Sequence, residues 1–166
     1  MTKPLHTVFL GIGSNIEPVE NIKSGLIQLR HLDKKLTVSK TYQSEAVGFE
    51  GPRFLNLVAM IRTSKSIPEL ITILKNIEFT HGREPHLKKY SSRTLDIDVL
   101  TYDNLQGSYD GMLLPRPEIV DQAYVLRPFA ELAPDTSLPG SSYTMQALWK
   151  AFDKKSQPLT EMSICW

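Results

Sequence analysis

The stretch Arg93–Leu100, with the sequence RTLDIDVL, alternates between apolar and polar side chains. Its apolar positions of one parity are Leu95, Ile97 and Val99, and its acidic positions of the other parity are Asp96 and Asp98. Successive side chains of a β-strand point to opposite faces, so this alternation predicts a strand with one buried face. The same geometry places the two carboxylates together on the other face, roughly 7 Å apart along the strand.

Two aspartates on one strand face require an explanation, because aspartate is a poor strand former. Carboxylate oxygens at this spacing suit Mg²⁺, which proteins commonly hold with one or two carboxylates and the phosphates of a nucleotide. The alternative is a solvated strand face on which Asp96 and Asp98 bind nothing. Residues elsewhere in the sequence distinguish between these two interpretations.

The composition is typical of one soluble globular domain, and we expect residues 1–166 to form it. Of the 166 residues, 41% are hydrophobic and 22% are charged, which is enough for a single buried core. The net charge of +1 provides no bulk attraction to nucleic acid or to an anionic membrane. The single cysteine, Cys165, excludes an intramolecular disulfide, and no apolar run is long enough for a membrane span. These features predict a cytoplasmic location.

Hydrophobic periodicity and turn residues predict the order strand, helix, strand, strand, helix, strand, followed by further elements. The predicted strands cover residues 7–12, 36–44, 54–62 and the aspartate stretch, and the predicted helices cover residues 18–31 and 66–82, the second opened by a capping box of Ser66 and Glu69. This order is that of an α+β ferredoxin-like plait, an antiparallel sheet with helices packed on one face. The expected C-terminal additions include a short helix over residues 123–132, interrupted at Pro128, and an amphipathic helix over residues 145–152.

Two arginines and an aromatic–amide pair are further candidate site residues. Arg83 and Arg93 flank a polar loop that leads into the aspartate stretch, and planar guanidinium groups match phosphate oxygens. Phosphoryl-type transfer depends mainly on cations placed around the moving phosphates. Phe54 and Asn56 share one face of the predicted third strand, so a ring can stack on a heterocycle while an amide reads its edge. The alternatives are solvation of the arginines, core packing of Phe54 and a structural hydrogen bond for Asn56.

Five short motifs follow one another along the chain at characteristic separations. They are GSN at 13–15, FLN at 54–56, GR at 82–83, SRTLDIDVL at 92–100 and LRPFAELAP at 126–134. In these motifs the chain resembles the 6-hydroxymethyl-7,8-dihydropterin pyrophosphokinases of folate biosynthesis, whose signature reads PRTLDLDIL. The resemblance covers roughly residues 7 to 140 and is specific because all five motifs occur in the right order.

The resemblance implies transfer of a pyrophosphoryl group from ATP to the hydroxymethyl group of the pterin, leaving AMP, by a monomeric Mg²⁺-dependent enzyme. Asp96 and Asp98 would hold two Mg²⁺ ions along the triphosphate, and Arg83 and Arg93 would be the catalytic groups on the moving phosphates. The pterin would be bound by Ser44, Val47, Phe54, Asn56 and Tyr124. The nucleotide would be bound by Lys88, Lys89, Tyr90, Val99 and Arg116.

Several positions depart from the family pattern, mostly on the nucleotide side. Pro85 stands where the family often has a second arginine, Arg116 where it has histidine, and Gln122 where an arginine follows. Glu45-Ala46 stands in place of a Pro-Pro pair. We hypothesise that Arg116, with Lys88 or Lys89, replaces the lost positive charge. The departures therefore concern nucleotide affinity more than the reaction itself.

Two other functions are alternatives. One is a relative with the same fold that binds pterin but uses ATP weakly or not at all. The other is an RNA-binding module, because RNA-recognition motifs share the plait topology. The chain has no RNP1-like run of glycine and aromatic residues, and its net charge is near zero, which argues against RNA. The expected partners are ATP and the pterin, with neither nucleic acid nor membrane.

Overall fold

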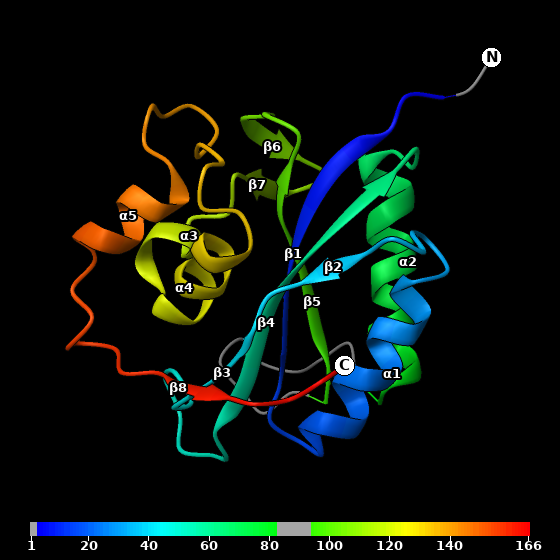
Figure 1. The fold of residues 1–166 in the computed structure, drawn as a ribbon. Helices are drawn as coiled ribbons and strands as arrows, with labels where there is room; N and C mark the ends of the chain where they lie inside the picture. Colours follow the sequence, from blue (N-terminus) through cyan, green and yellow to red (C-terminus); the bar gives the residue numbers. More distant parts are fainter. Residues whose placement is uncertain (1–2, 83–93) are drawn as a thin grey trace.

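A six-stranded antiparallel sheet forms the centre of the computed structural model, which describes residues 3–82 and 94–166 (Figure 1). The strands run in the order β5-β1-β4-β3-β8, and β2 also pairs with β4. Their bounds are β1 (His6–Ser14), β2 (Thr37–Val38), β3 (Thr41–Ser44), β4 (Phe54–Thr63), β5 (Asp96–Tyr102) and β8 (Thr160–Met162). The first five of these, with the two helices between them, give the ferredoxin-like plait that the sequence predicts.

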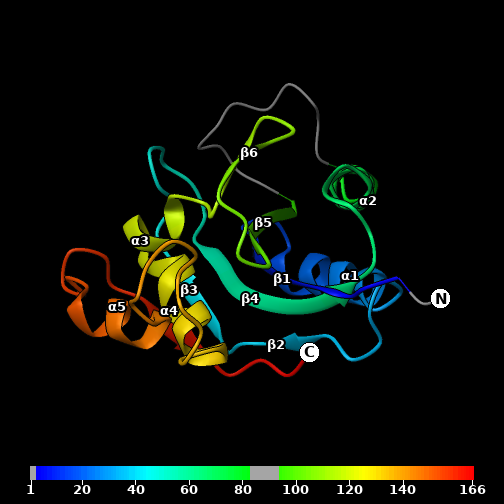
Figure 2. The ribbon, with the colours of Figure 1, turned by 90° about the horizontal axis from the view of Figure 1, so that it is seen from above.

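Helices cover both faces of this sheet (Figures 1 and 2). On one face lie α1 (Pro18–Leu29) and α2 (Ile67–Thr80), and on the other lie α3 (Glu118–Asp121), α4 (Ala123–Leu132) and α5 (Met145–Ala151). The two plait helices share one face, as the sequence predicts, and the C-terminal additions cover the other. The physical reason lies in β4, which is apolar on both faces and would expose one of them without a second helical layer.

Each face has its own hydrophobic core. Toward α1 and α2, Leu57 of β4 packs with Leu10, Leu26 and Leu70, all of which are fully buried or nearly so. Toward α4, Val58 of β4 packs with Phe9 and Phe129, whose rings stack with centroids 4.4 Å apart. The alternation of Leu57 and Val58 between two cores follows directly from the period of two along a strand.

The start of α2 is the predicted capping box, and the predicted second strand is divided. Ser66 Oγ accepts the N–H of Glu69, and Glu69 Oε1 accepts the N–H of Ser66, both at 3.4 Å. The predicted strand over residues 36–44 is two strands, β2 and β3, separated at Ser39. There the Ser39 side chain accepts the N–H of Val58 at 2.9 Å, replacing a main-chain ladder bond.

The C-terminal part differs most from expectation. α4 continues through Pro128 without a break; the cost of the lost N–H and of the ring is offset because the nearby Leu126 and Phe129 are packed in the core. A hairpin of β6 (Gly107–Tyr109) and β7 (Met112–Leu114) follows β5. The tail supplies β8, which pairs with β3, and Trp166 Nε1 donates to Thr41 Oγ1 at 2.9 Å. Among the described residues, no helix has the length and apolar character to cross a membrane.

Candidate active site

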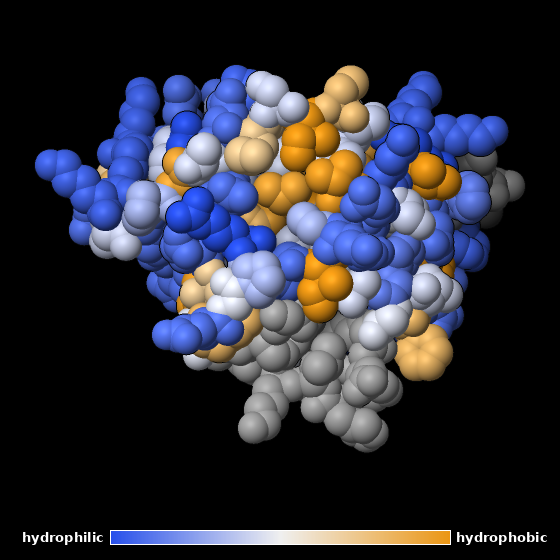
Figure 3. All heavy atoms as spheres, turned by 90° about the horizontal axis from the view of Figure 1, so that it is seen from below, coloured by the Kyte–Doolittle hydropathy of each residue, from blue (hydrophilic) through white to orange (hydrophobic). Residues whose placement is uncertain are grey.

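A pocket of about 230 Å³ lies on the α3–α4 face of the sheet, near the end where β1 stops and β4 and β5 start. Its walls come from β1, β4, β5, the β3–β4 connection and the segment from Arg116 to Val125. Seen from this end of the sheet, apolar side chains extend from the upper edge into the middle of the face, with hydrophilic ones to the left and right (Figure 3). The pocket therefore combines an apolar interior with a charged border, which is typical of small-molecule sites.

The residues predicted to bind the pterin all line this pocket: Ser44, Val47, Phe54, Asn56 and Tyr124. Asn56 is buried, and its Nδ2 donates to Ser44 Oγ at 2.8 Å and to Tyr42 O at 3.2 Å. These two bonds use both hydrogens of the amide, so Oδ1 is the atom that Asn56 can present to an N–H donor of a bound ring. The amide is thus oriented in advance of any ligand.

An aromatic residue that sequence reasoning missed also lines the pocket. Phe49 lies edge-on to Phe54, with ring centroids 6.3 Å apart and planes at 90°. The signal in the sequence is an aromatic residue inside a glycine- and proline-containing loop, where core packing is not expected. Phe49 therefore extends the apolar wall that Phe54 begins.

Asp96 and Asp98 line the same pocket. Ile97 and Val99, between and after them, are buried in the α1–α2 core, as the alternation predicts. Burial and the neighbouring Asp96 raise the pKa of Asp98 well above its usual value, while Arg116 opposes the rise. Two carboxylates at close quarters with this electrostatic character favour a bound cation.

Two glycines of β1 leave the space in front of these carboxylates open. Gly11 pairs with Asp98 and Gly13 pairs with Asp96 across the β1–β5 ladder, and directly paired residues share a face of the sheet. A Cβ on Gly13 would lie 3.3 Å from Asn56 Oδ1, and one on Gly11 would lie 3.2 Å from Leu100 Cδ2. Both glycines lie inside β1, on the pocket floor.

Arg116 lies beside the aspartates and is held by two acidic groups. Its Nη2 is 3.5 Å from Asp98 Oδ1, and its Nε is 3.6 Å from Glu118 Oε2. Within the described residues, Glu118 Oε2 is buried and accepts no hydrogen bond. Glu118 and Gln122 also line the pocket, and neither was predicted as a site residue. In the part of the chain that the structure describes, the Arg116 guanidinium therefore lies at this border between the carboxylates of Asp98 and Glu118.

The remaining predicted residues divide into two groups. The side chain of Val99 lies in the α1–α2 core, so any contact to a nucleotide would have to come from its main chain. Arg83, Lys88, Lys89, Tyr90 and Arg93 lie outside the described residues, as does the divergent Pro85. The roles expected for these residues from the sequence remain predictions.

The GSN motif at residues 13–15 connects the pocket's flanking segments. Ser14 is fully buried, and its hydroxyl donates to Thr94 O, at the start of the aspartate stretch, at 2.5 Å. Asn15 Nδ2 donates to Pro52 O, just before β4, at 3.0 Å. The motif thus fastens the end of β1 to the chain entering β5 and to the chain entering β4, a role that the sequence alone did not indicate.

The described part of the chain is an antiparallel plait whose pocket brings paired carboxylates together with aromatic and amide side chains, an arrangement compatible with phosphate-transferring enzymes. The sequence model of the 7,8-dihydro-6-hydroxymethylpterin-pyrophosphokinase (HPPK) family matches residues 9–134. The 2-amino-4-hydroxy-6-hydroxymethyldihydropteridine pyrophosphokinase of Synechocystis sp. is 35% identical over 151 residues, covering 89% of this chain and 77% of that protein. The Haemophilus influenzae protein of the same name is 31% identical over 153 residues, covering 90% and 95%. The chain belongs to the HPPK family.

A solved structure shows the same fold at low sequence identity. The crystal structure of an HPPK-DHPS in complex with substrates superposes with a TM-score of 0.71 at 12% identity. The match covers 92% of this chain but 45% of that one, so the chain spans less than half of that longer protein. At this identity the likeness concerns the fold.

Proposed function

We propose that this protein transfers a pyrophosphoryl group from ATP to 6-hydroxymethyl-7,8-dihydropterin, giving AMP and the pterin diphosphate for folate biosynthesis. The observation that carries the proposal is that one pocket is lined both by the oriented Asn56 amide and the Phe54 ring and by Asp96 and Asp98. Membership of the HPPK family supports the same reaction.

The pocket residues support two functions, binding of the pterin ring on one side and placement of its hydroxymethyl group near the carboxylates on the other. Phe54, Phe49 and Tyr124 would hold the pterin ring by apolar and aromatic contact, while Asn56 Oδ1 would accept from its edge. This fixes the hydroxymethyl group toward the aspartates, and apolar walls exclude water that would otherwise compete as acceptor of the transferred group. Productive orientation of two bound reactants can supply much of the rate enhancement.

The donor set at Asp96 and Asp98 fits Mg²⁺, and we propose two Mg²⁺ ions as the cofactor. Among the described residues no cluster of three or more His, Cys, Asp or Glu side chains has metal-binding geometry. That agrees with an ion that takes its other ligands from water and phosphate oxygens, as Mg²⁺ does. Bound Mg²⁺ would neutralise charge on the phosphates.

The protein's own groups would act around the triphosphate. Arg116, at 3.5 Å from Asp98, is placed to exchange its carboxylate contacts for phosphate oxygens. Arg83 and Arg93 are proposed to stabilise charge on the group in transfer, and Lys88, Lys89 and Tyr90 to bind the nucleotide. Ile97 directs its N–H away from β1, and by alternation the main chain of Val99 faces the same side of β5, where a base could bind it.

The test is AMP formation from ATP and Mg²⁺, measured with and without 6-hydroxymethyl-7,8-dihydropterin. Pterin-dependent AMP is the expected result. ADP in place of AMP would mean that a different phosphorus is attacked, which contradicts the proposal. Pterin binding without turnover would favour the catalytically weak relative, and binding of single-stranded RNA would favour the RNA-binding module.

A further inference from the structure

Glu78 is a buried carboxylate on α2 to which the reaction above assigns no role. The residue is 6% exposed, and its Oε2 accepts the main-chain N–H of Ile97 at 2.8 Å. Buried carboxylates are rare in proteins because their desolvation is costly. Glu78 also lies near the C-terminal end of α2 (Ile67–Thr80), where the helix dipole disfavours negative charge. Apolar packing alone would be better served by leucine, so the carboxylate requires another explanation.

The explanation lies in the position of β5 at the edge of the sheet. β5 pairs with β1 on one side, and the described part of the chain provides no strand on its other side. In an antiparallel strand, consecutive N–H groups face alternate sides, and the N–H of Ile97 faces the side without a strand. Glu78 replaces the missing strand at this one position, and Ile97 stands between Asp96 and Asp98.

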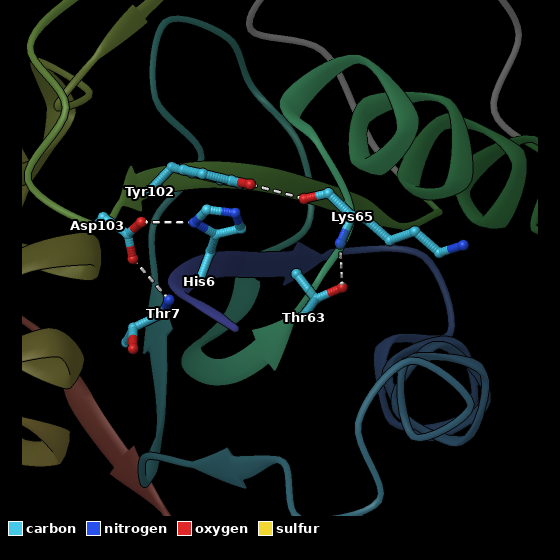
Figure 4. Close-up of polar contacts among 6 residues, drawn as sticks. All are labelled: His6, Thr7, Thr63, Lys65, Tyr102 and Asp103. Carbon is cyan, nitrogen blue, oxygen red and sulfur yellow. Dashed lines mark hydrogen bonds and ion pairs between the residues drawn. The ribbon is translucent and has the colours of Figure 1, made fainter. Parts of the chain in front are cut away.

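The far end of β5 is anchored by different bonds (Figure 4). Asp103, which follows β5, faces His6 Nδ1 at 2.7 Å and accepts the N–H of Thr7 at 2.8 Å. The Tyr102 hydroxyl donates to Lys65 O, ahead of α2, at 2.7 Å. The strand is thus fixed at Tyr102 and Asp103 independently of the pocket, which leaves Glu78 as an anchor at the aspartate end.

We propose that Glu78 is a positioning residue for the Asp96–Asp98 pair: by holding the N–H of Ile97, it fixes the side of β5 that faces away from β1 and the direction of both carboxylates. The inference rests on the proposed function, since the role of the pair in the transfer comes from there. Side chains that neighbour a metal site commonly act in this way, and their loss costs about 10- to 100-fold in metal affinity or activity.

Two substitutions separate the hydrogen bond from the charge. Glu78→Gln keeps an oxygen that accepts the N–H of Ile97 but removes the charge, whereas Glu78→Ala removes the acceptor. Asn76→Ala, exposed on the same helix, is the matched control. For each variant, kcat for AMP formation, KM for the pterin, the Mg²⁺ concentration for half-maximal rate and amide hydrogen exchange at Ile97 are measured.

We expect Glu78→Ala to lower kcat by about 10- to 100-fold, to raise the Mg²⁺ requirement, and to leave the KM for the pterin near that of the wild type. Exchange at Ile97 should accelerate, and Glu78→Gln should recover most of kcat. Wild-type kcat and Mg²⁺ dependence in a folded Glu78→Ala protein would overturn the inference. So would a Glu78→Gln protein as impaired as Glu78→Ala, because the charge would then be what matters.

The inference is testable even where Glu78→Ala does not fold or the proposed function fails. Exchange at Ile97 in the wild-type protein should be slow, and rapid exchange there would overturn the inference without any variant. A wild-type protein that produces no AMP would contradict the proposed function, while the response of Ile97 exchange to Glu78→Gln and Glu78→Ala would still report on the anchor.

Discussion

At the scale of single residues, the pocket depends both on the side chains that line it and on glycines, which have none. Gly13 lies opposite Asp96 in the β1–β5 ladder, and its missing Cβ leaves room for Asn56 Oδ1 and the Phe54 ring. Alternation along β5 could be read from the sequence because it is local. The pairing of Gly13 with Asp96 could not, because register between distant strands depends on the whole sheet.

Gly13→Ala tests this arrangement. The added Cβ would stand 3.3 Å from Asn56 Oδ1 and 3.8 Å from Phe54 Cδ1, which forces the Asn56 amide to shift. We expect pterin affinity, measured by calorimetric titration, to fall by about tenfold, the effect of roughly 1.4 kcal/mol. Nucleotide affinity should change much less. Unchanged pterin affinity would mean that Asn56 does not orient the ring.

Asp98→Asn tests the electrostatic cost of the carboxylate pair in the ligand-free protein. The pKa of Asp98 is raised by burial and by Asp96, so ionised Asp98 destabilises the folded state. That destabilisation is absent at pH values below the unfolded pKa and grows as pH rises toward and through the raised folded pKa. Asp98→Asn should therefore raise the Tm at pH 7–8 by a few degrees, with little gain near pH 4, while abolishing transfer.

Thermal melts from pH 4 to pH 8 in the presence of EDTA measure this effect. Asp103→Asn serves as a comparison, since Asp103 lies at the opposite end of β5 and bonds to His6 and Thr7; its substitution should destabilise the protein. A lower Tm for Asp98→Asn than for the wild type at pH 7.5 would contradict the assigned cause of the raised pKa.

At the scale of elements, the start of a helix could be predicted from the sequence, whereas the packing of one element against another could not. The capping box at Ser66 is encoded within four consecutive residues, and the structure has it. β8 and the uninterrupted α4 depend on what they pack against: β8 completes the edge at β3, and Pro128 is tolerated because the residues around it are buried. Sequence periodicity in one segment contains no information about its neighbours in space.

Ser66→Ala tests how much the capping box stabilises α2. Loss of the cap should cost about 1 kcal/mol of unfolding free energy, measured by urea denaturation, with activity preserved below the transition. The Ser66 contacts lower the pKa of Glu69, so the wild type gains stability from ionised Glu69 above its unfolded pKa and loses it as pH falls through the folded pKa. Ser66→Ala should flatten this acidic dependence, whereas the exposed neighbour change Ser64→Ala should have no such effect.

At the scale of the whole molecule, the two faces of the sheet differ in function: one forms a core and the other contains the pocket. The α1–α2 face is a continuous apolar core that receives Leu95, Ile97 and Val99. The α3–α4 face is apolar only around Phe9, Val58 and Phe129, and toward the end of the sheet it opens into the pocket. The fold thus places a rigid core directly behind the carboxylates, which suits a site that must hold charged groups in fixed positions.

This division predicts that removal of metal weakens nucleotide binding but not pterin binding. The pterin side is organised by the bonds of Asn56 to Ser44 and Tyr42, none of which involves a carboxylate. With EDTA, a pterin analogue should still raise the Tm, whereas a non-hydrolysable ATP analogue should lose most of its effect. A ligand at 100 times its Kd stabilises by about 2.7 kcal/mol, so a thermal melt can measure the difference between the two ligands.

The Asp96→Asn, Asp98→Asn double variant should reproduce the EDTA result in the presence of Mg²⁺. Equal stabilisation by the ATP analogue with and without Mg²⁺ would show that the aspartates do not act through the metal.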